Sequence, residues 1–233
     1  MSHTRARDDA STTGTRIVSM PSITYEIAMR TLRVDYQEID RRCHAIAEIL
    51  TRASSAHLTA PAGTNLLLDI AGRAGRPSSG VFTAPGAFGN LPGGESYVAP
   101  VEGKAEGTLV IDASSMDPGA EAQKPDEPTI IEVRDGLAQT IEGTGAHALQ
   151  GIFSKVGVGA RNIAELGIGT NPETRLSGNI LESEKVAGTA HVALGNSLHI
   201  GGTVDVPFHL DGVISHPTVI ADGIVVIEDG RLA

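Results

Sequence analysis

The stretch Thr129-Ile130-Ile131-Glu132-Val133-Arg134-Asp135-Gly136 decides the fold class, because it joins a short run of β-branched residues to a turn signal. Val, Ile and Thr favour the extended backbone of a strand, and Gly tolerates the positive φ angle that a tight hairpin turn requires. The Asp-Gly pair recurs at Asp222-Gly223 and Asp229-Gly230, on either side of the apolar run Ile224-Val225-Val226-Ile227. This pattern predicts antiparallel strands joined by hairpins.

Short apolar runs of the same kind follow one another after Ala53, separated by glycine, proline and asparagine. Three more lie at 57–59, 66–68 and 107–111. Runs of this length, bounded by turn residues, are typical of strands. We therefore expect an α+β fold with a mostly antiparallel sheet and a few helices.

Helical spacing is found mainly in the part that precedes these strands. One helix is predicted from Ser22, after Pro21, and a second from Asp35, which has the spacing of a capping box with Glu38. The apolar residues of the second helix fall on one face and comprise Ile39, Cys43, Ile46 and Leu50. Cys43 is thus interpreted as a small core residue rather than a reactive thiol.

The chain divides into three parts on these patterns. Residues 1–15 are polar and without periodicity, so a disordered lead-in is expected. A helical N-terminal segment would cover 16–53, and a metal-binding catalytic-type α+β domain would cover 54–233. Within that domain, helical turns are predicted at 146–156 and 183–186, and an exposed loop at 119–128.

Composition excludes several classes of function. The 233 residues are 40% hydrophobic and 20% charged, as in a globular protein that buries a core. Aromatic residues make up 3% and the formal net charge is −10, which argues against a nucleic-acid partner. No apolar run reaches the roughly 20 residues of a membrane-spanning helix, and a single cysteine and the lack of a signal sequence indicate the cytoplasm.

Five residues stand out as candidate metal ligands, because each lies in a glycine-rich or turn-like block where packing does not require such a side chain. They are Glu95, Glu165, His191, His209 and Asp211, in the blocks 89–95, 164–172, 188–195 and 209–214. In an extended segment alternate residues point to one side, so His209 and Asp211 can meet one ion. A carboxylate between apolar neighbours, as at Glu165, must be paired, protonated or metal-bound.

The order of these blocks, from about Pro21 to the C-terminus, resembles the leucyl aminopeptidase, or aminopeptidase T, family of metal-dependent exopeptidases. The resemblance implies the fold of that family's C-terminal catalytic domain, a homodimer, and two divalent ions, Zn, Mn or Co, held by the five residues. It also implies hydrolysis at the N-terminal residue of small peptides or amides by metal-activated water, with Glu95 or Glu165 as proton shuttle. The family's catalytic tyrosine corresponds to Leu198 here, and its N-terminal α/β domain has no counterpart in this length of chain.

Two alternatives remain open. A related branch, similar to 2,5-dihydroxypyridine 5,6-dioxygenase, holds one ferrous ion with two histidines and an aspartate, and its first histidine falls where this chain has Glu165. A ring-cleaving dioxygenase would therefore use His191, His209 and Asp211 here and act on a hydroxylated aromatic or pyridine ring. The third interpretation is an inactive metal-binding scaffold that partners a longer paralogue.

Overall fold

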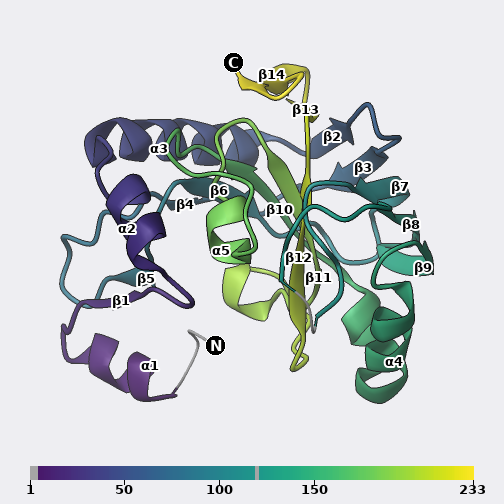
Figure 1. Ribbon diagram of the computed structural model, residues 1–233, viewed down its shortest axis with the longest axis horizontal. Helices are drawn as coiled ribbons and strands as arrows, with labels where there is room; N and C mark the ends of the chain where they lie inside the picture. The colour runs from purple at the N-terminus through teal and green to yellow at the C-terminus, as the bar shows by residue number, and fades with distance from the viewer. Residues whose placement is uncertain (1–4, 119–120) are drawn as a thin grey trace.

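An eight-stranded antiparallel sheet forms one half of the molecule. The computed structural model, shown in Figure 1, describes residues 5–118 and 121–233. The strand order of this sheet is β15-β14-β13-β2-β3-β7-β8-β9. Its strands are β2 (Ser55–Thr59), β3 (Asn65–Asp69), β7 (Glu106–Ile111), β8 (Thr129–Arg134), β9 (Leu137–Glu142), β13 (Thr218–Ala221), β14 (Ile224–Glu228) and β15 (Arg231–Leu232).

The three predicted Asp-Gly turns join neighbouring strands of this sheet. Asp135-Gly136 links β8 to β9, Asp222-Gly223 links β13 to β14, and Asp229-Gly230 links β14 to β15. Both residues of each pair have positive φ angles, from 44° to 84°. This geometry matches the right-handed twist of the flanking strands, so the predicted hairpins are confirmed.

A second, five-stranded antiparallel sheet has the order β12-β11-β10-β6-β4. Its strands are β4 (Arg76–Ser78), β6 (Glu95–Val98), β10 (Ile163–Gly169), β11 (Ala190–Gly195) and β12 (His209–Ile214). Every residue of β10 and β11 is buried. A small parallel pair, β1 (Ile17–Ser19) with β5 (Phe88–Asn90), completes the strands of the described residues. The predicted α+β class with mostly antiparallel sheets is confirmed.

The longest helix, α3 (Tyr36–Arg52), covers β4 and β6. It begins where predicted, because the side chain of Asp35 accepts hydrogen bonds from the backbone N–H groups of Gln37 and Glu38. Its buried face contains the four predicted residues and Ala47. The buried Sγ of Cys43 lies 3.2 Å from the hydroxyl of Thr170. The other helices are α1 (Arg5–Thr12), α2 (Tyr25–Thr31), α4 (Ala146–Val156), α5 (Ile180–Ser183) and the 3-10 helices η1 (Val158–Arg161) and η2 (Leu198–Ile200).

Three local predictions need correction. Residues 5–12 of the expected disordered lead-in form α1, since the segment has two alanines and no glycine or proline before Gly14. Helix α2 begins at Tyr25 rather than Ser22, because Thr24 is its N-cap. Helix α5 precedes its predicted position because Asn179 accepts from the N–H of Glu182 and starts the turn there. Of the predicted loop, residues 119–120 lie outside the described residues and 121–128 contain no helix or strand.

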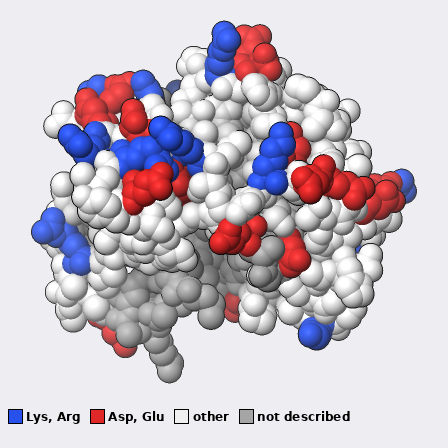
Figure 2. Space-filling model, viewed as in Figure 1, with Lys and Arg blue, Asp and Glu red and all other residues white. Residues whose placement is uncertain are grey.

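One aliphatic core joins both sheets to α3 and α4. It includes Leu50 of α3, Leu66 of β3, Leu166 of β10 and Leu149 of α4, all fully buried. No helix of the described residues is long and apolar enough to cross a bilayer. On the face drawn in Figure 2, basic side chains lie among acidic ones rather than forming a continuous basic surface.

Candidate metal centre

The register of the five-stranded sheet brings the five predicted residues to one face. Residues that lie directly opposite each other in neighbouring strands share a face. Each of the five lies opposite a glycine or alanine, which leaves room for its side chain over the sheet. The pairs are Glu95 with Gly169, Glu165 with Ala193, His191 with Gly167, His209 with Gly195 and Asp211 with Ala193.

Gly167 shows why one of these small residues is required. A Cβ atom built on it would lie 2.7 Å from Cδ2 of His191 and closer still to Nε2 and Cε1. The imidazole ring of His191 therefore occupies the space that any larger residue at 167 would fill. The glycine-rich block around Glu165 is thus explained by close packing of a site residue rather than by a turn.

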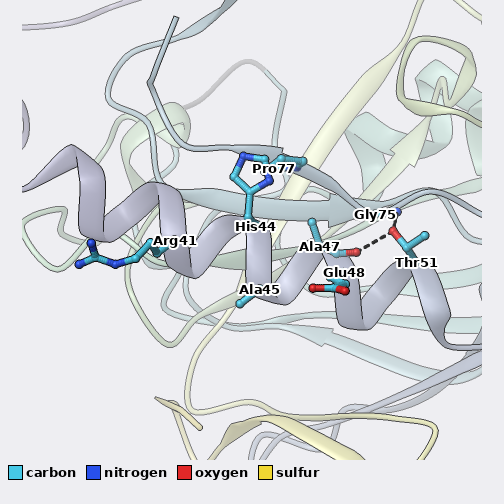
Figure 3. A pocket seen from close by; sticks show the side chains of 8 residues that line it. All are labelled: Arg41, His44, Ala45, Ala47, Glu48, Thr51, Gly75 and Pro77. Atoms are coloured by element: carbon cyan, nitrogen blue, oxygen red, sulfur yellow. Dashed lines mark hydrogen bonds between the residues drawn. The ribbon is translucent and has the colours of Figure 1, made fainter. Parts of the chain in front are cut away.

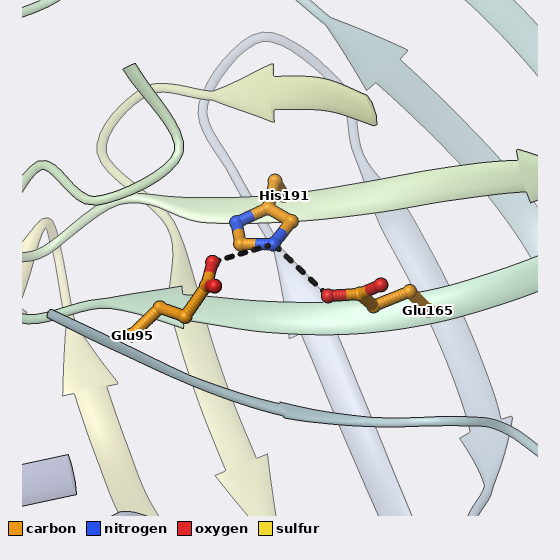
Figure 4. A group of neighbouring side chains, drawn as sticks. All are labelled: Glu95, Glu165 and His191. Carbon is orange, nitrogen blue, oxygen red and sulfur yellow. Dashed lines mark hydrogen bonds and ion pairs between the residues drawn. The ribbon is translucent and has the colours of Figure 1, made fainter. Parts of the chain in front are cut away.

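His191 lies between two buried carboxylates. Its Nε2 atom is 3.6 Å from Oε2 of Glu95 and 3.4 Å from Oε1 of Glu165, with all three side chains converging in Figure 4. Burial disfavours the charged imidazole, but the hydrogen bond to Glu165 and the charge of Glu95 raise the pKa of His191 to about 9. Its Nδ1 atom is buried with no hydrogen-bond partner among the described residues.

His209 completes a second group on the other side of Glu165. Its Nε2 atom lies 3.5 Å from Oε2 of Glu165 and 3.4 Å from Oδ1 of Asp211. Its Nδ1–H donates to the backbone carbonyl of Asn196 at 2.8 Å, which orients the ring and points Nε2 toward the carboxylates. Burial would raise the pKa of Asp211, but the charge of His209 holds it well below its usual range. His209 is therefore oriented as histidine ligands of metals are.

Two residues that sequence reasoning missed, Glu184 and Lys185, adjoin the five. Lys185 is fully buried, and its Nζ lies 2.8 Å from Oε1 of Glu95 and forms an ion pair with Oε1 of Glu184. Burial alone would lower the pKa of Lys185, but these two carboxylates raise it, so the ammonium group is charged. In the sequence, Glu-Ser-Glu-Lys has the composition of a solvated turn, and no signal in one sequence distinguishes it from a buried one.

The segment that carries Lys185 is fixed to the Glu95 block through Asn171. The side-chain amide of Asn171 donates to the carbonyl of Gly93 at 2.8 Å, and its backbone N–H donates to the carbonyl of Lys185 at 2.9 Å. The Gly-Thr-Asn-Pro stretch thereby connects two parts of the site that are far apart in the chain.

Tyr97 also faces the site, two residues after Glu95 on the same strand. Burial, followed by the charges of Glu165 and Glu95, raises its pKa. The sequence could have indicated Tyr97, because it lies two residues after Glu95 and alternate residues of a strand share a face. Leu198, at the position of the expected tyrosine, is instead 45% exposed in η2.

Metal-ligating atoms gather in three overlapping groups, within each of which they lie no more than 4.8 Å apart. The groups are Glu95, Glu165 and His191; Glu165, His209 and Asp211; and Glu184, His191 and Asp211. None of these groups in the described chain combines His191 with both His209 and Asp211, as the single-iron alternative expected. Four carboxylates face one ammonium group, so the donor set is suited to a divalent cation.

Two of the hollows in the surface of the described residues differ in their relation to the donor cluster. One, about 240 Å³, reaches the donor cluster because Asp211 lines it together with Ser115, Asp117, Asn179, Leu181 and Leu210. The other, about 610 Å³ and shown in Figure 3, lies along α3 between Arg41, His44, Glu48 and Gly75. It shares no residue with the donor cluster, so of these two hollows the smaller one gives a ligand access to the cluster.

Comparison with known proteins adds three findings. A model of the family described as NicX, 2,5-dihydroxypyridine 5,6-dioxygenase, matches residues 1–233. The structure of the 2,5-dihydroxypyridine dioxygenase from Pseudomonas putida KT2440 is similar, with a TM-score of 0.83 and 22% identity over 99% of this chain and 69% of that one. Wild-type AmpT from Thermus thermophilus has a TM-score of 0.72 and 21% identity over 90% of this chain and 58% of that one.

No curated protein matches the sequence. The relation to both groups suggested by the sequence blocks is thus supported, and identities this low establish the fold alone. The family whose model matches is the dioxygenase family, so the aminopeptidase family expected first is not confirmed.

Proposed function

This chain belongs to the NicX, 2,5-dihydroxypyridine 5,6-dioxygenase, family, and we propose that it is a metal-dependent enzyme that opens a hydroxylated nitrogen-containing aromatic ring with dioxygen. The family and both structural neighbours are enzymes. Ring opening thus takes the place of the peptide hydrolysis expected first from the sequence. The ion would be held by Glu165, His209 and Asp211, a set that neither interpretation of the sequence expected.

The observation that carries the proposal is that one donor group opens onto a cavity of ring size. Asp211 belongs both to the group with Glu165 and His209 and to the lining of the 240 Å³ hollow. Leu181 and Leu210 supply apolar walls there, while Ser115 and Asn179 supply polar atoms. Apolar walls with a few polar groups are typical of small-molecule sites. A single substituted ring fits such a volume, whereas a peptide of several residues does not.

Three side chains would hold the ion in this proposal. Glu165 and Asp211 supply carboxylate oxygens, and His209 supplies Nε2, whose orientation is fixed by the carbonyl of Asn196. A ferrous ion bound to one imidazole and two carboxylates would supply the one-electron chemistry that ground-state dioxygen needs to react with a ring. His191 donates to Glu165 from the buried side and keeps that carboxylate directed at the site.

The protein's own residues then provide position and a dry environment. The hollow holds the ring beside Asp211, and Tyr97 and Glu165, on neighbouring strands, bound the buried side of the cluster. A carboxylate can also accept a proton from a ring hydroxyl, and Asp211 is the carboxylate of the donor group that lines the hollow.

A second candidate, a metal-dependent hydrolase, is favoured by the position of Glu165. Its two oxygens face Nε2 of His191 and Nε2 of His209, at 3.4 and 3.5 Å. A carboxylate between two imidazoles resembles the bridging ligand of a two-metal site that activates water. The similarity to AmpT supports this candidate at the level of the fold.

Metal reconstitution separates the two candidates. The protein would be purified without oxygen, stripped with a chelator and loaded with Fe²⁺, or with Zn²⁺, Mn²⁺ or Co²⁺. Oxygen uptake with 2,5-dihydroxypyridine and with hydroquinone tests ring opening, and release of nitroaniline from leucine p-nitroanilide tests hydrolysis. We expect oxygen uptake with the pyridine and Fe²⁺, with loss of the ring's ultraviolet absorbance.

His209→Ala and Glu165→Ala should abolish both the uptake and the retained iron. His147→Ala, at an exposed position of α4, removes the same side chain away from the site and should change neither. Amide hydrolysis without oxygen uptake would reject the dioxygenase in favour of the hydrolase. Neither activity, together with no bound metal, would support the inactive scaffold.

Assembly and location stay predictions. We propose a homodimer in the cytoplasm with a small-molecule substrate and no nucleic-acid partner. Light scattering coupled to size-exclusion chromatography measures the oligomeric state, and a monomer at working concentration would contradict the homodimer.

A further inference from the structure

We propose that Lys185 is a built-in cation that holds Glu95 and Glu184, so that the centre binds one divalent ion, at Glu165, His209 and Asp211. This inference deepens the proposed function and rests on its metal site, but it concerns how many ions bind and what replaces the second.

Lys185 contacts two buried carboxylates. Its side chain is fully buried, and its ammonium group contacts Oε1 of Glu95 at 2.8 Å and Oε1 of Glu184. A buried carboxylate needs a cation or several hydrogen-bond donors. One ammonium group between two carboxylates meets that need without a metal ion.

The three donor groups differ in whether they include a carboxylate that Lys185 contacts. The group with Glu165, His209 and Asp211 contains neither partner of Lys185. The other two groups contain one partner each, Glu95 in one and Glu184 in the other. A second ion would therefore have to share a carboxylate with Lys185 and lie beside its positive charge, which opposes binding.

The two histidines differ in what their Nδ1 atoms contact. Nδ1 of His209 donates to a backbone carbonyl, the usual support of a histidine ligand. Nδ1 of His191 has no partner among the described residues, so a metal on its Nε2 would leave a buried N–H without an acceptor. His191 thus fits a donor to Glu165 better than a ligand.

The test counts ions on the full-length protein. Chelator-stripped protein is titrated with Mn²⁺ in a calorimeter, and metal content is measured after desalting. Wild type should bind one ion per chain. Lys185→Met removes the cation and keeps most of the side chain's length, so we expect two ions and a melting temperature that Mn²⁺ raises by at least about twice as many degrees as in wild type. Lys155→Met, the same change at an exposed position of α4, should behave as wild type.

A second pair of variants decides the matter where Lys185→Met does not fold. Glu95→Gln should keep one ion with a dissociation constant within about threefold of wild type, whereas Glu165→Gln should weaken binding by at least about tenfold. Two ions on wild type, or equal losses in both glutamine variants, would overturn the role of Lys185 and leave a metal-dependent enzyme standing. No ion on wild type would overturn the proposed metal site as well.

Discussion

Gly167→Ala should damage the metal centre although it adds a single methyl group. The φ angle of Gly167 is not in the left-handed region, so alanine can adopt the backbone there. The new Cβ would fall closer than 3.0 Å to three atoms of the His191 imidazole. Because real Cβ contacts do not come that close, the ring must move by on the order of 1 Å, and overpacking of this size costs about 1–3 kcal/mol.

Movement of His191 breaks its contacts with Glu95 and Glu165, which are 3.6 and 3.4 Å long. Loss of a residue that orients a metal ligand weakens metal binding by about 10- to 100-fold. We therefore expect the Mn²⁺ dissociation constant of Gly167→Ala to rise by that factor in calorimetric titration. The free energy of unfolding, from urea denaturation of the metal-free protein, should fall by about 1–3 kcal/mol.

Gly151→Ala is the matched control. Gly151 lies exposed within α4, and a Cβ there would meet nothing within 4 Å. The same change should stabilise the protein by about 0.5–1 kcal/mol, because alanine is the better helix former, and leave metal binding as in wild type. Wild-type metal affinity in Gly167→Ala would refute the claim that this glycine makes room for His191.

Three further predictions follow from buried groups. The side chain of Glu182 is fully buried, and the guanidinium group of Arg30 lies 2.5 Å from it. Arg30→Ala removes this partner, so the free energy of unfolding measured by urea denaturation should fall by about 3 kcal/mol. Arg52→Ala breaks an exposed ion pair with Glu48 and should change the free energy of unfolding by less than about 1 kcal/mol. Burial raises the pKa of the Cys43 thiol to about 11, so little thiolate is present at pH 8. Labelling of the native protein by a disulfide reagent should therefore be at least roughly 100-fold slower than labelling in urea, and the native rate should rise as the pH increases. Equal rates in the native protein and in urea would contradict the burial of Cys43. If the proposed site holds an ion, a chelator should lower the melting temperature and Fe²⁺ or Mn²⁺ should restore it, as calorimetry would show. No shift would mean that these ions do not bind the folded state preferentially.

The sequence predicts the parts of this fold that depend on local chemistry. The Asp-Gly hairpins are confirmed because few residue pairs adopt two consecutive positive φ angles. Helix α3 is confirmed because Asp35 caps it and its apolar residues repeat at helical spacing. The start of α2 and the place of α5 were missed, since each depends on which of several adjacent polar residues becomes the cap.

In the candidate site, too, local features could be predicted from the sequence and long-range contacts could not. The alternation of His209 and Asp211 is a local property and could be derived, whereas the proximity of Glu95 to Glu165 follows from pairing between distant strands and came only with a family resemblance. Lys185 could not be found from its neighbours, because a buried ion pair and a solvated one have the same residue types. Its role depends on burial, which only the tertiary structure gives.

The two faces of the central strands explain why donors and small residues alternate in the sequence. On one face of β10 and β11, Leu166, Ile168, Val192 and Leu194 are fully buried in the aliphatic core. On the other, glycine and alanine stand opposite each donor. Strands that are buried on both faces are usually apolar on both. Here the second face carries carboxylates that are largely shielded from water, and Lys185 and the histidines lie against them. The small residues therefore do more than avoid a clash, because they let the donor atoms of each group lie within 4.8 Å of one another, as the proposed metal site requires.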